Sequence, residues 1–225
     1  MAKTKLKIEA RKLRKTGESI KKIAKLLNVS PSSVSTWCRD IKLTSEQIKV
    51  LEKNARDPNY GRRLSYSLKQ QAERIEKTNR LCKEGIEEVG NLNRRELFLT
   101  GIALYWGEGF KKDSQAGLAS LSPDIIKFFL KWLKECFGYS LEDLIVRITL
   151  NISHKHRIDE ITKYWVGITG IPLSNFRKPF YQKVKWKKVY EKPDEYHGVL
   201  RIKVRRSTDF LRKISGYIKG LSLQV

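Results

Sequence analysis

A single carboxylate, Glu108, follows an apolar run and lies between two glycines in the stretch Leu-Thr-Gly-Ile-Ala-Leu-Tyr-Trp-Gly-Glu-Gly-Phe at 99–110. The run predicts a helix that ends at these glycines and carries the carboxylate at its end. Ala103 and Gly107 are small and four residues apart, so they share a helix face that a second helix can approach closely. A carboxylate at a symmetric pair of such helices can bind a divalent metal ion together with its copy. The alternative is a buried helix with a glycine cap and an exposed glutamate.

Residues 101–109 resemble the nine-residue motif of the LAGLIDADG family of homing endonucleases and their DNA-binding relatives. Ala103 and Gly107 fall on the family's small packing positions, and Glu108 falls on its acidic metal-binding position. Trp106 stands where the family name has its first Asp, at a position that varies within the family. The resemblance implies a homodimer through the helix at 97–109, with Glu108 as the metal ligand and, if the protein cleaves DNA, as the catalytic residue.

Basic residues alternate with apolar ones in two stretches near the C-terminus, at 183–187 and 200–205. Such alternation places the basic side chains on one face of a strand and the apolar ones on the other. Like charges opposite one another destabilise a sheet, so a basic face indicates an anionic partner. A basic sheet lying along a DNA groove is the hypothesis, and an ordinary solvated face is the alternative. The candidate DNA-binding residues are Lys183, Lys185, Lys187, Arg201, Lys203 and Arg205, extended by Arg177 and Lys178.

A second candidate DNA-binding surface lies near the N-terminus. Three helices are predicted there, the second capped by Ser19 and the third running from Pro31 to about Arg39. The run at 20–37 resembles the helix-turn-helix of resolvases and many prokaryotic repressors. A three-helix bundle that binds protein is the alternative. Short hydroxyls and an arginine suit phosphates and base edges in a major groove, and the third helix offers Ser32, Ser33, Ser35, Thr36 and Arg39.

The chain as a whole predicts an α+β protein in three parts. These are a three-helix helix-turn-helix domain at 1–57, a long linker helix within 58–92, and a LAGLIDADG-like domain of αββα type at 93–225 with a basic antiparallel sheet. The linker helix carries apolar residues at heptad spacing. This seam predicts either a dimeric coiled coil or, in the interpretation we prefer, a single helix that rests one stripe on the next domain.

The third part has clear local signals. Asn93 and Glu96 predict a capping box at the start of the motif helix. The remaining pattern predicts helices at 123–137, 158–168 and 209–221, and strands at 110–112, 117–122, 144–151, 180–189 and 199–206, the last two joined by a turn at 190–198.

Charge narrows the class of partner. The 225 residues carry a formal net charge of +23, which favours a polyanion and most simply nucleic acid. No run approaches the ~18 apolar residues of a membrane-spanning helix, and the first residues lack the apolar core of a signal peptide. The three cysteines are scattered and form no Cys-x-x-Cys pair. We therefore expect a cytoplasmic protein, nucleoid-associated in a prokaryote, with no membrane partner.

Two functions fit these features. The first is a site-specific protein that binds double-stranded DNA with both surfaces and acts as a regulator, for which no cofactor is certain. The second is a homodimeric, metal-dependent DNA endonuclease in which Glu108 of each chain binds Mg²⁺ and the metal activates water. Binding to structured RNA is a third possibility, which the predicted major-groove helix disfavours.

Overall fold

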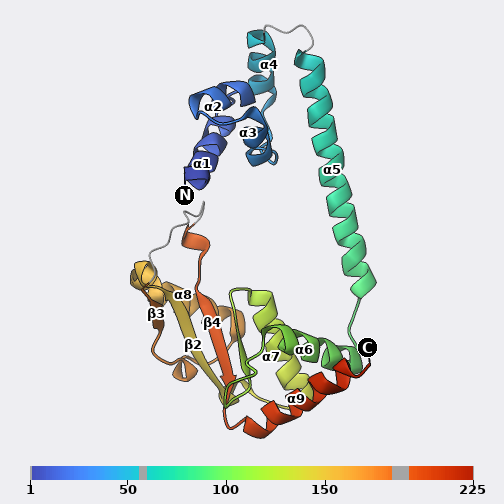
Figure 1. Ribbon diagram of the computed structural model, residues 1–225, viewed down its shortest axis with the longest axis vertical. Helices are drawn as coiled ribbons and strands as arrows, with labels where there is room; N and C mark the ends of the chain where they lie inside the picture. The colour runs from blue at the N-terminus through green and yellow to red at the C-terminus, as the bar shows by residue number, and fades with distance from the viewer. Residues whose placement is uncertain (1, 56–59, 184–192, 225) are drawn as a thin grey trace. The chain divides into compact units, whose positions relative to one another are not determined.

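The computed structural model describes residues 2–55, 60–183 and 193–224. It shows a chain of helices with one four-stranded sheet, which confirms the expected mixture of α and β structure (Figure 1). Within the described part of the chain, every helix is too short or too polar to cross a membrane.

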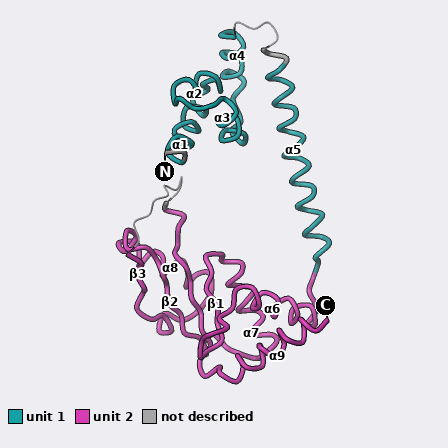
Figure 2. The backbone as a smooth tube through the Cα atoms, viewed as in Figure 1, with its two compact units in different colours: residues 1–90, 186–193 teal, residues 91–185, 194–225 magenta. Residues whose placement is uncertain are grey.

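The chain divides into two compact units (Figure 2). Unit 1 comprises residues 1–90 and 186–193, and unit 2 comprises residues 91–185 and 194–225. The long helix α5 (Tyr60–Val89) belongs to unit 1, and the whole sheet belongs to unit 2.

Three helices open unit 1, namely α1 (Ala2–Lys15), α2 (Ile20–Leu26) and α3 (Pro31–Trp37). Both α2 and α3 begin at a serine whose hydroxyl accepts a backbone N–H of the first turn, and the predicted Ser19 cap of α2 is confirmed. Between them, Asn28 has a φ of 51°, a left-handed conformation that asparagine tolerates and that turns the chain sharply. The small core of these helices consists of Ala10, Ile23, Ala24, Val34 and Cys38.

Helix α3 ends before the expected boundary near Arg39. Cys38 caps the helix with a buried side chain, and its Sγ lies 3.6 Å from the carbonyl oxygen of Ala10. Arg39 therefore lies in the turn that follows. A fourth helix, α4 (Ser45–Asn54), is absent from the sequence-based expectation, although Thr44 and Gln47 form a reciprocal capping box at its start.

The seam of α5 is only partly covered. Leu68 and Ile75 are half-buried, and the side-chain amide of Gln71 donates to the backbone oxygen of Arg39. Toward the end of the helix, Ile86 is 69% exposed, and no other element of unit 1 covers it among the described residues. The stripe resting on the next domain and the dimeric coiled coil therefore both stay predictions.

Unit 2 contains the sheet and four long helices. The helices are α6 (Arg94–Glu108), α7 (Pro123–Phe137), α8 (Ile158–Thr169) and α9 (Thr208–Ser222). The strands are β1 (Gly117–Ser120), β2 (Leu144–Asn151), β3 (Phe180–Gln182) and β4 (Val199–Val204), in the order β1-β4-β2-β3. The helices at 123–137 and 158–168, the strand at 144–151 and the Asn93–Glu96 capping box are confirmed to within a residue.

The predicted antiparallel sheet is wrong in one respect, because the sheet is mixed. Strand β4 pairs antiparallel with both β1 and β2, whereas β3 pairs parallel with β2. The expected pairing with 199–206 is therefore wrong for 180–182, and residues 184–189 of the expected strand lie outside the described part of the chain. Helix α8 is the reason, since a crossover connection between β2 and β3 brings the second strand back parallel to the first. The expected strand at 110–112 is also wrong, and only Gly109 makes an isolated bridge there, to Leu118.

One face of the sheet is buried and the other is open. Leu200, Ile202 and Val204 of β4 pack into the main core with the inward residues of α6, α7, α8 and α9. Residues that alternate with them lie on the opposite face. We call this side the open face, defined by Ile145, Arg147 and Thr149 of β2, Val199, Arg201 and Lys203 of β4, and Phe180 of β3.

Candidate nucleic-acid interface

The open face presents a cluster of cations at one register of the sheet. Arg147 on β2 lies directly opposite Arg201 on β4, and Ile145 lies opposite Lys203. A cleft of about 560 Å³ follows this face. Its lining residues are Gln115, Ile145, Arg147, Thr149, Arg177, Phe180, Arg201 and Lys203.

Alternation along the strands fixes the direction of these side chains. In β4, Arg201 and Lys203 are interleaved with fully buried Leu200, Ile202 and Val204, so the two cations must point to the open face. Arg147 is exposed between buried Val146 and Ile148 in the same way. Burial of the apolar residues therefore holds the cations in place.

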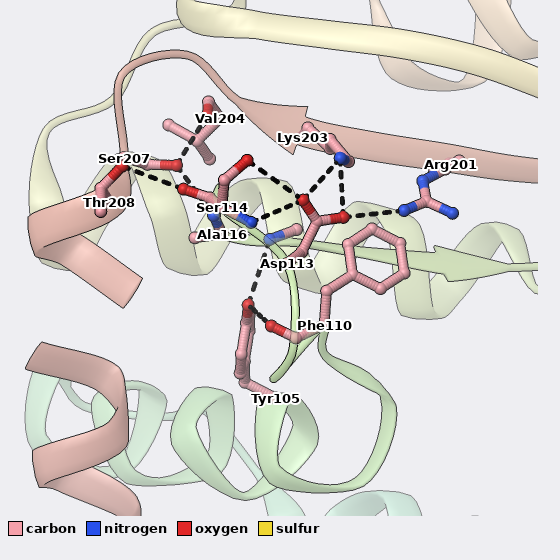
Figure 3. Close-up of polar contacts among 11 residues, drawn as sticks. Tyr105, Phe110, Asp113, Ser114, Ala116, Arg201, Lys203, Val204, Ser207 and Thr208 are labelled. Carbon is pink, nitrogen blue, oxygen red and sulfur yellow. Dashed lines mark hydrogen bonds and ion pairs between the residues drawn. The ribbon is translucent and has the colours of Figure 1, made fainter. Parts of the chain in front are cut away.

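One carboxylate, Asp113, is bound by two of the cations (Figure 3). Lys203 Nζ lies 2.8 Å from its Oδ1 and 2.6 Å from its Oδ2, and Arg201 Nη2 lies 2.9 Å from Oδ2. The hydrogen bond from Lys203 is the main cause that lowers the pKa of Asp113 from 3.8 to about 2, helped by the backbone N–H of Ser114 and the charge of Arg201 and opposed by partial burial. The guanidinium of Arg201 also lies 4.1 Å from the ring centroid of Phe110.

The loop that carries Asp113 is fastened at both ends (Figure 3). The hydroxyl of Tyr105 on α6 donates to the Phe110 oxygen at 2.9 Å and accepts from the Gly117 N–H at 3.2 Å. At the start of α9, the Thr208 hydroxyl donates to the Ser114 oxygen at 3.0 Å. Asp113 is therefore held over β4 by the fold.

The predicted DNA-binding surface of unit 1 is exposed for the most part. Ser32, Ser35, Thr36 and Arg39 are all exposed. Ser33 is half-buried, and its hydroxyl lies 2.9 Å from the hydroxyl of the Ser30 cap. The Ser33 hydroxyl thus supports the start of α3, whereas the others face solvent.

Glu108 is the last residue of α6, as the apolar run predicts, and it is exposed, as the alternative of a capped helix with an exposed glutamate expects. Ala103 and Gly107 are also exposed, and a Cβ added at Gly107 would meet no atom within 4 Å. No group of three His, Cys, Asp or Glu residues that could hold a metal ion occurs in the described part of the chain.

No family model, curated protein or solved structure matches this chain. The assignment of a function consequently depends on the residues and their geometry alone.

The structure brings together some of the sequence-predicted residues. Arg177 lines the same cleft as Arg201 and Lys203, and its backbone N–H donates to the Val146 oxygen at 2.7 Å. Lys178 is exposed beside Arg177, and Lys183 is exposed just after β3. Lys185 and Lys187 lie outside the described residues.

Arg205 follows the end of β4 and is not among the residues that line the cleft. Strand β4 ends at Val204, and the Arg205 backbone N–H donates to the Asp143 oxygen, so the predicted alternation stops one residue too early to include it. Two residues that sequence reasoning missed are Arg147 and Phe180. Arg147 had a signal, because it alternates with buried Val146 and Ile148, whereas Phe180 had none.

Proposed function

We propose that this protein binds double-stranded DNA through the open face of the unit 2 sheet and through the exposed face of α3, as a site-specific regulator. The single observation that carries the proposal is the placement of Arg147 opposite Arg201, with Lys203 and Arg177 lining the same cleft. The net charge of +23 agrees with an anionic partner. A DNA-bound regulator of this kind belongs in the cytoplasm, at the nucleoid in a prokaryote.

Repulsion is the reason that this cluster points to a ligand. Two like charges directly opposite one another weaken a strand pair, typically by a few tenths of a kcal/mol to ~1 kcal/mol. In the free protein Asp113 neutralises one positive charge of the cluster, and no carboxylate pairs with Arg147 or Arg177 among the described contacts. Phosphates along a duplex supply negative charge at several points at once, so they relieve the repulsion across the whole cleft.

The exposed α3 supports site specificity. Helix α2, a short turn at Asn28 and helix α3 follow the helix-turn-helix pattern, in which the second helix enters the major groove. Ser35 and Thr36 present short hydroxyls that can reach base edges, whereas the sheet offers mainly charges. The exposed face of α3 would then recognise the sequence, and the open face of the sheet would supply most of the affinity.

Selection from a randomised duplex library tests this proposal. The intact protein is incubated with the library at about 150 mM salt, and bound DNA is amplified and sequenced over several rounds. We expect one enriched sequence, and its length should fall when Ser35 and Thr36 are both replaced by alanine. Failure to enrich any sequence over the starting pool contradicts the site-specific function, and enrichment of folded RNA in a parallel arm would replace DNA by RNA as the partner.

A second candidate, a homodimeric Mg²⁺-dependent endonuclease, is favoured by Glu108. The carboxylate is exposed at the end of α6, beside Ala103 and Gly107, which are small and uncovered. A second copy packed on this face would bring two Glu108 side chains close to a twofold axis, where Mg²⁺ prefers carboxylate and phosphate oxygens. The metal would supply an activated water for phosphodiester hydrolysis.

Cleavage of a plasmid library separates the two candidates. The regulator predicts that supercoiled plasmids stay intact with or without Mg²⁺. The endonuclease predicts nicked or linear plasmid with Mg²⁺ and none with Glu108→Gln. Glu135→Gln on α7 is a matched control, because Glu135 is also exposed and lies outside the motif.

A further inference from the structure

Three contacts converge on one anion at the edge of the cleft. Both oxygens of Asp113 accept from Lys203, at 2.8 and 2.6 Å, and Oδ2 also accepts from Arg201 at 2.9 Å. The two cations stand two residues apart on β4 and so project from the same face. The pair is therefore already arranged to hold a single negatively charged group.

The carboxylate comes from a connecting loop and not from the sheet. Asp113 lies between α6 and β1, and it is ninety residues from Lys203 in the chain. Tyr105 and Thr208 fasten the loop at residues on either side of Asp113. Apart from the two cations, the Asp113 carboxylate contacts only its neighbour Ser114 among the described residues. The side chain can therefore rotate away without loss of the anchors.

The three side chains remain accessible from solvent. The exposed fractions are 40% for Arg201, 24% for Lys203 and 19% for Asp113. Arg201 and Lys203 also line the cleft, next to Arg147 and Arg177. An anion that enters the cleft thus reaches the cation pair directly.

A phosphodiester matches the carboxylate that is bound here. Both groups carry one negative charge and offer two oxygens, and the guanidinium fork binds either in the same geometry. Binding two anions to Arg201 and Lys203 at once is unfavourable, because like charges a few ångströms apart repel strongly at a partly buried site. The phosphate and Asp113 therefore compete.

We propose that Arg201 and Lys203 form a phosphate site that Asp113 occupies in the free protein and that a backbone phosphate of DNA takes over in the complex. This inference rests on the proposed function and deepens it. Asp113 acts as an internal competitor that lowers affinity for any duplex, so only a site that also engages the other surfaces binds tightly. Because it lowers specific and non-specific affinity by the same factor, it leaves their ratio unchanged and raises the number of further contacts that tight binding requires.

Asp113→Asn tests the competition. The amide keeps the size of the side chain and its bond from the Ser114 N–H but loses the charge. We expect random-sequence duplex to bind about fivefold tighter, the upper range for one partly exposed ion pair. The slope of log affinity against log salt should stay close to that of the wild type, because the same phosphate contacts form in both complexes.

Two comparisons isolate the effect from a general change of charge. Asp209→Asn removes the same charge from another ion pair, with Arg212 at 2.7 Å on α9, and should leave the affinity close to that of the wild type. In a Lys203→Ala background, Asp113→Asn should increase duplex affinity by less than half as much as in the wild type. The reason is that Lys203, one of the two cations for which Asp113 and the phosphate compete, is then absent. Equal affinities for Asp113→Asn and Asp209→Asn would overturn the inference.

A second measurement keeps the test valid if Asp113→Asn folds poorly. The carboxyl carbon of Asp113 in the wild-type chain is followed by NMR while a short duplex is added. A shift of this signal on saturation supports displacement, and an unchanged signal in a saturated complex overturns it. A wild-type protein that binds no duplex at about 50 mM salt defeats the proposed function itself, whereas binding with an unmoved Asp113 defeats this inference alone.

Discussion

Arg147 of β2 lies directly opposite Arg201 of β4 on the open face of the sheet. A pair of guanidinium groups in this register weakens the strand pairing unless a negative charge lies nearby. Asp113 supplies one such charge to Arg201 in the free chain. We propose that an anionic partner neutralises the rest of the cluster.

Replacing Arg147 by alanine should weaken DNA binding without lowering the stability of the fold. The free energy of unfolding should stay within about 0.5 kcal/mol of the wild type or rise, because the repulsion with Arg201 is removed. Duplex affinity should fall, and the salt slope should become shallower by about one. Fluorescence anisotropy and urea denaturation measure the two quantities. Lys131→Ala on α7, an exposed cation outside the open face, is the control and should change neither.

Two glycines of α6 should respond to substitution in opposite ways. A Cβ at Gly101 would lie 2.0 Å from the ring of fully buried Trp132, so Gly101→Ala should cost about 1–3 kcal/mol of stability. Gly107→Ala meets empty space and should be neutral or stabilise the helix by up to ~1 kcal/mol. Urea denaturation compares them, and equal losses for the two variants would contradict this account of α6 packing.

The same helix face should decide the oligomeric state. If two copies pack through Ala103 and Gly107, the larger side chain in Gly107→Leu should convert a dimer to a monomer without loss of helix content. Sedimentation velocity with and without DNA measures this, and circular dichroism checks the fold. A wild-type chain that stays monomeric in both conditions argues against the dimer.

Acid should weaken unit 2 through Asp113. Its pKa in the folded chain is about 2, lower than the ordinary 3.8, so its ion pairs stabilise the fold fully above about pH 4 and lose this effect as the pH falls toward 2. Asp113→Asn should therefore be less stable than the wild type at about pH 5, and the difference should shrink as the pH falls. Urea denaturation at a series of pH values measures this difference. A gap that stays constant with pH would show that the carboxylate does not stabilise the fold through its charge.

The hydroxyls of α3 should govern sequence preference more than affinity. Replacing exposed Thr36 by alanine should relax the preference at one base position by ~1–3 kcal/mol while leaving binding to random duplex nearly unchanged. Competition with single-base variants of the selected site measures the preference. Ser33→Ala serves as the comparison, because that hydroxyl is engaged with Ser30 and should affect helix stability instead.

Much of unit 2 could be predicted because its signals are local. The capping box of Asn93 with Glu96, the Ser122-Pro123 start of α7 and the alternation in β2 each need only neighbouring residues. The cations Arg201 and Lys203 followed from the same alternation. Arg147 carried an equal signal in β2, so it could have been assigned to the site from sequence alone.

Features that depend on distant contacts could not be predicted. The partner of β3 is decided by the crossover through α8, and the strand sequences do not encode it. Asp113 is one acidic residue in a turn, and nothing nearby indicates that it reaches Lys203 across the sheet. Gly101 was taken only as part of a motif, whereas its close contact with Trp132 becomes visible only when α6 and α7 pack.

The most direct test of the central claim is the salt dependence of duplex binding by the wild type and by an Arg147→Ala, Arg201→Ala double variant. Anisotropy with a labelled random duplex is measured from about 50 to about 200 mM salt. We predict that the wild-type affinity falls steeply, by orders of magnitude, and that the double variant binds more weakly with a slope shallower by about two. Identical slopes for the two proteins, or a wild-type affinity that does not respond to salt, would contradict the claim that this sheet binds DNA.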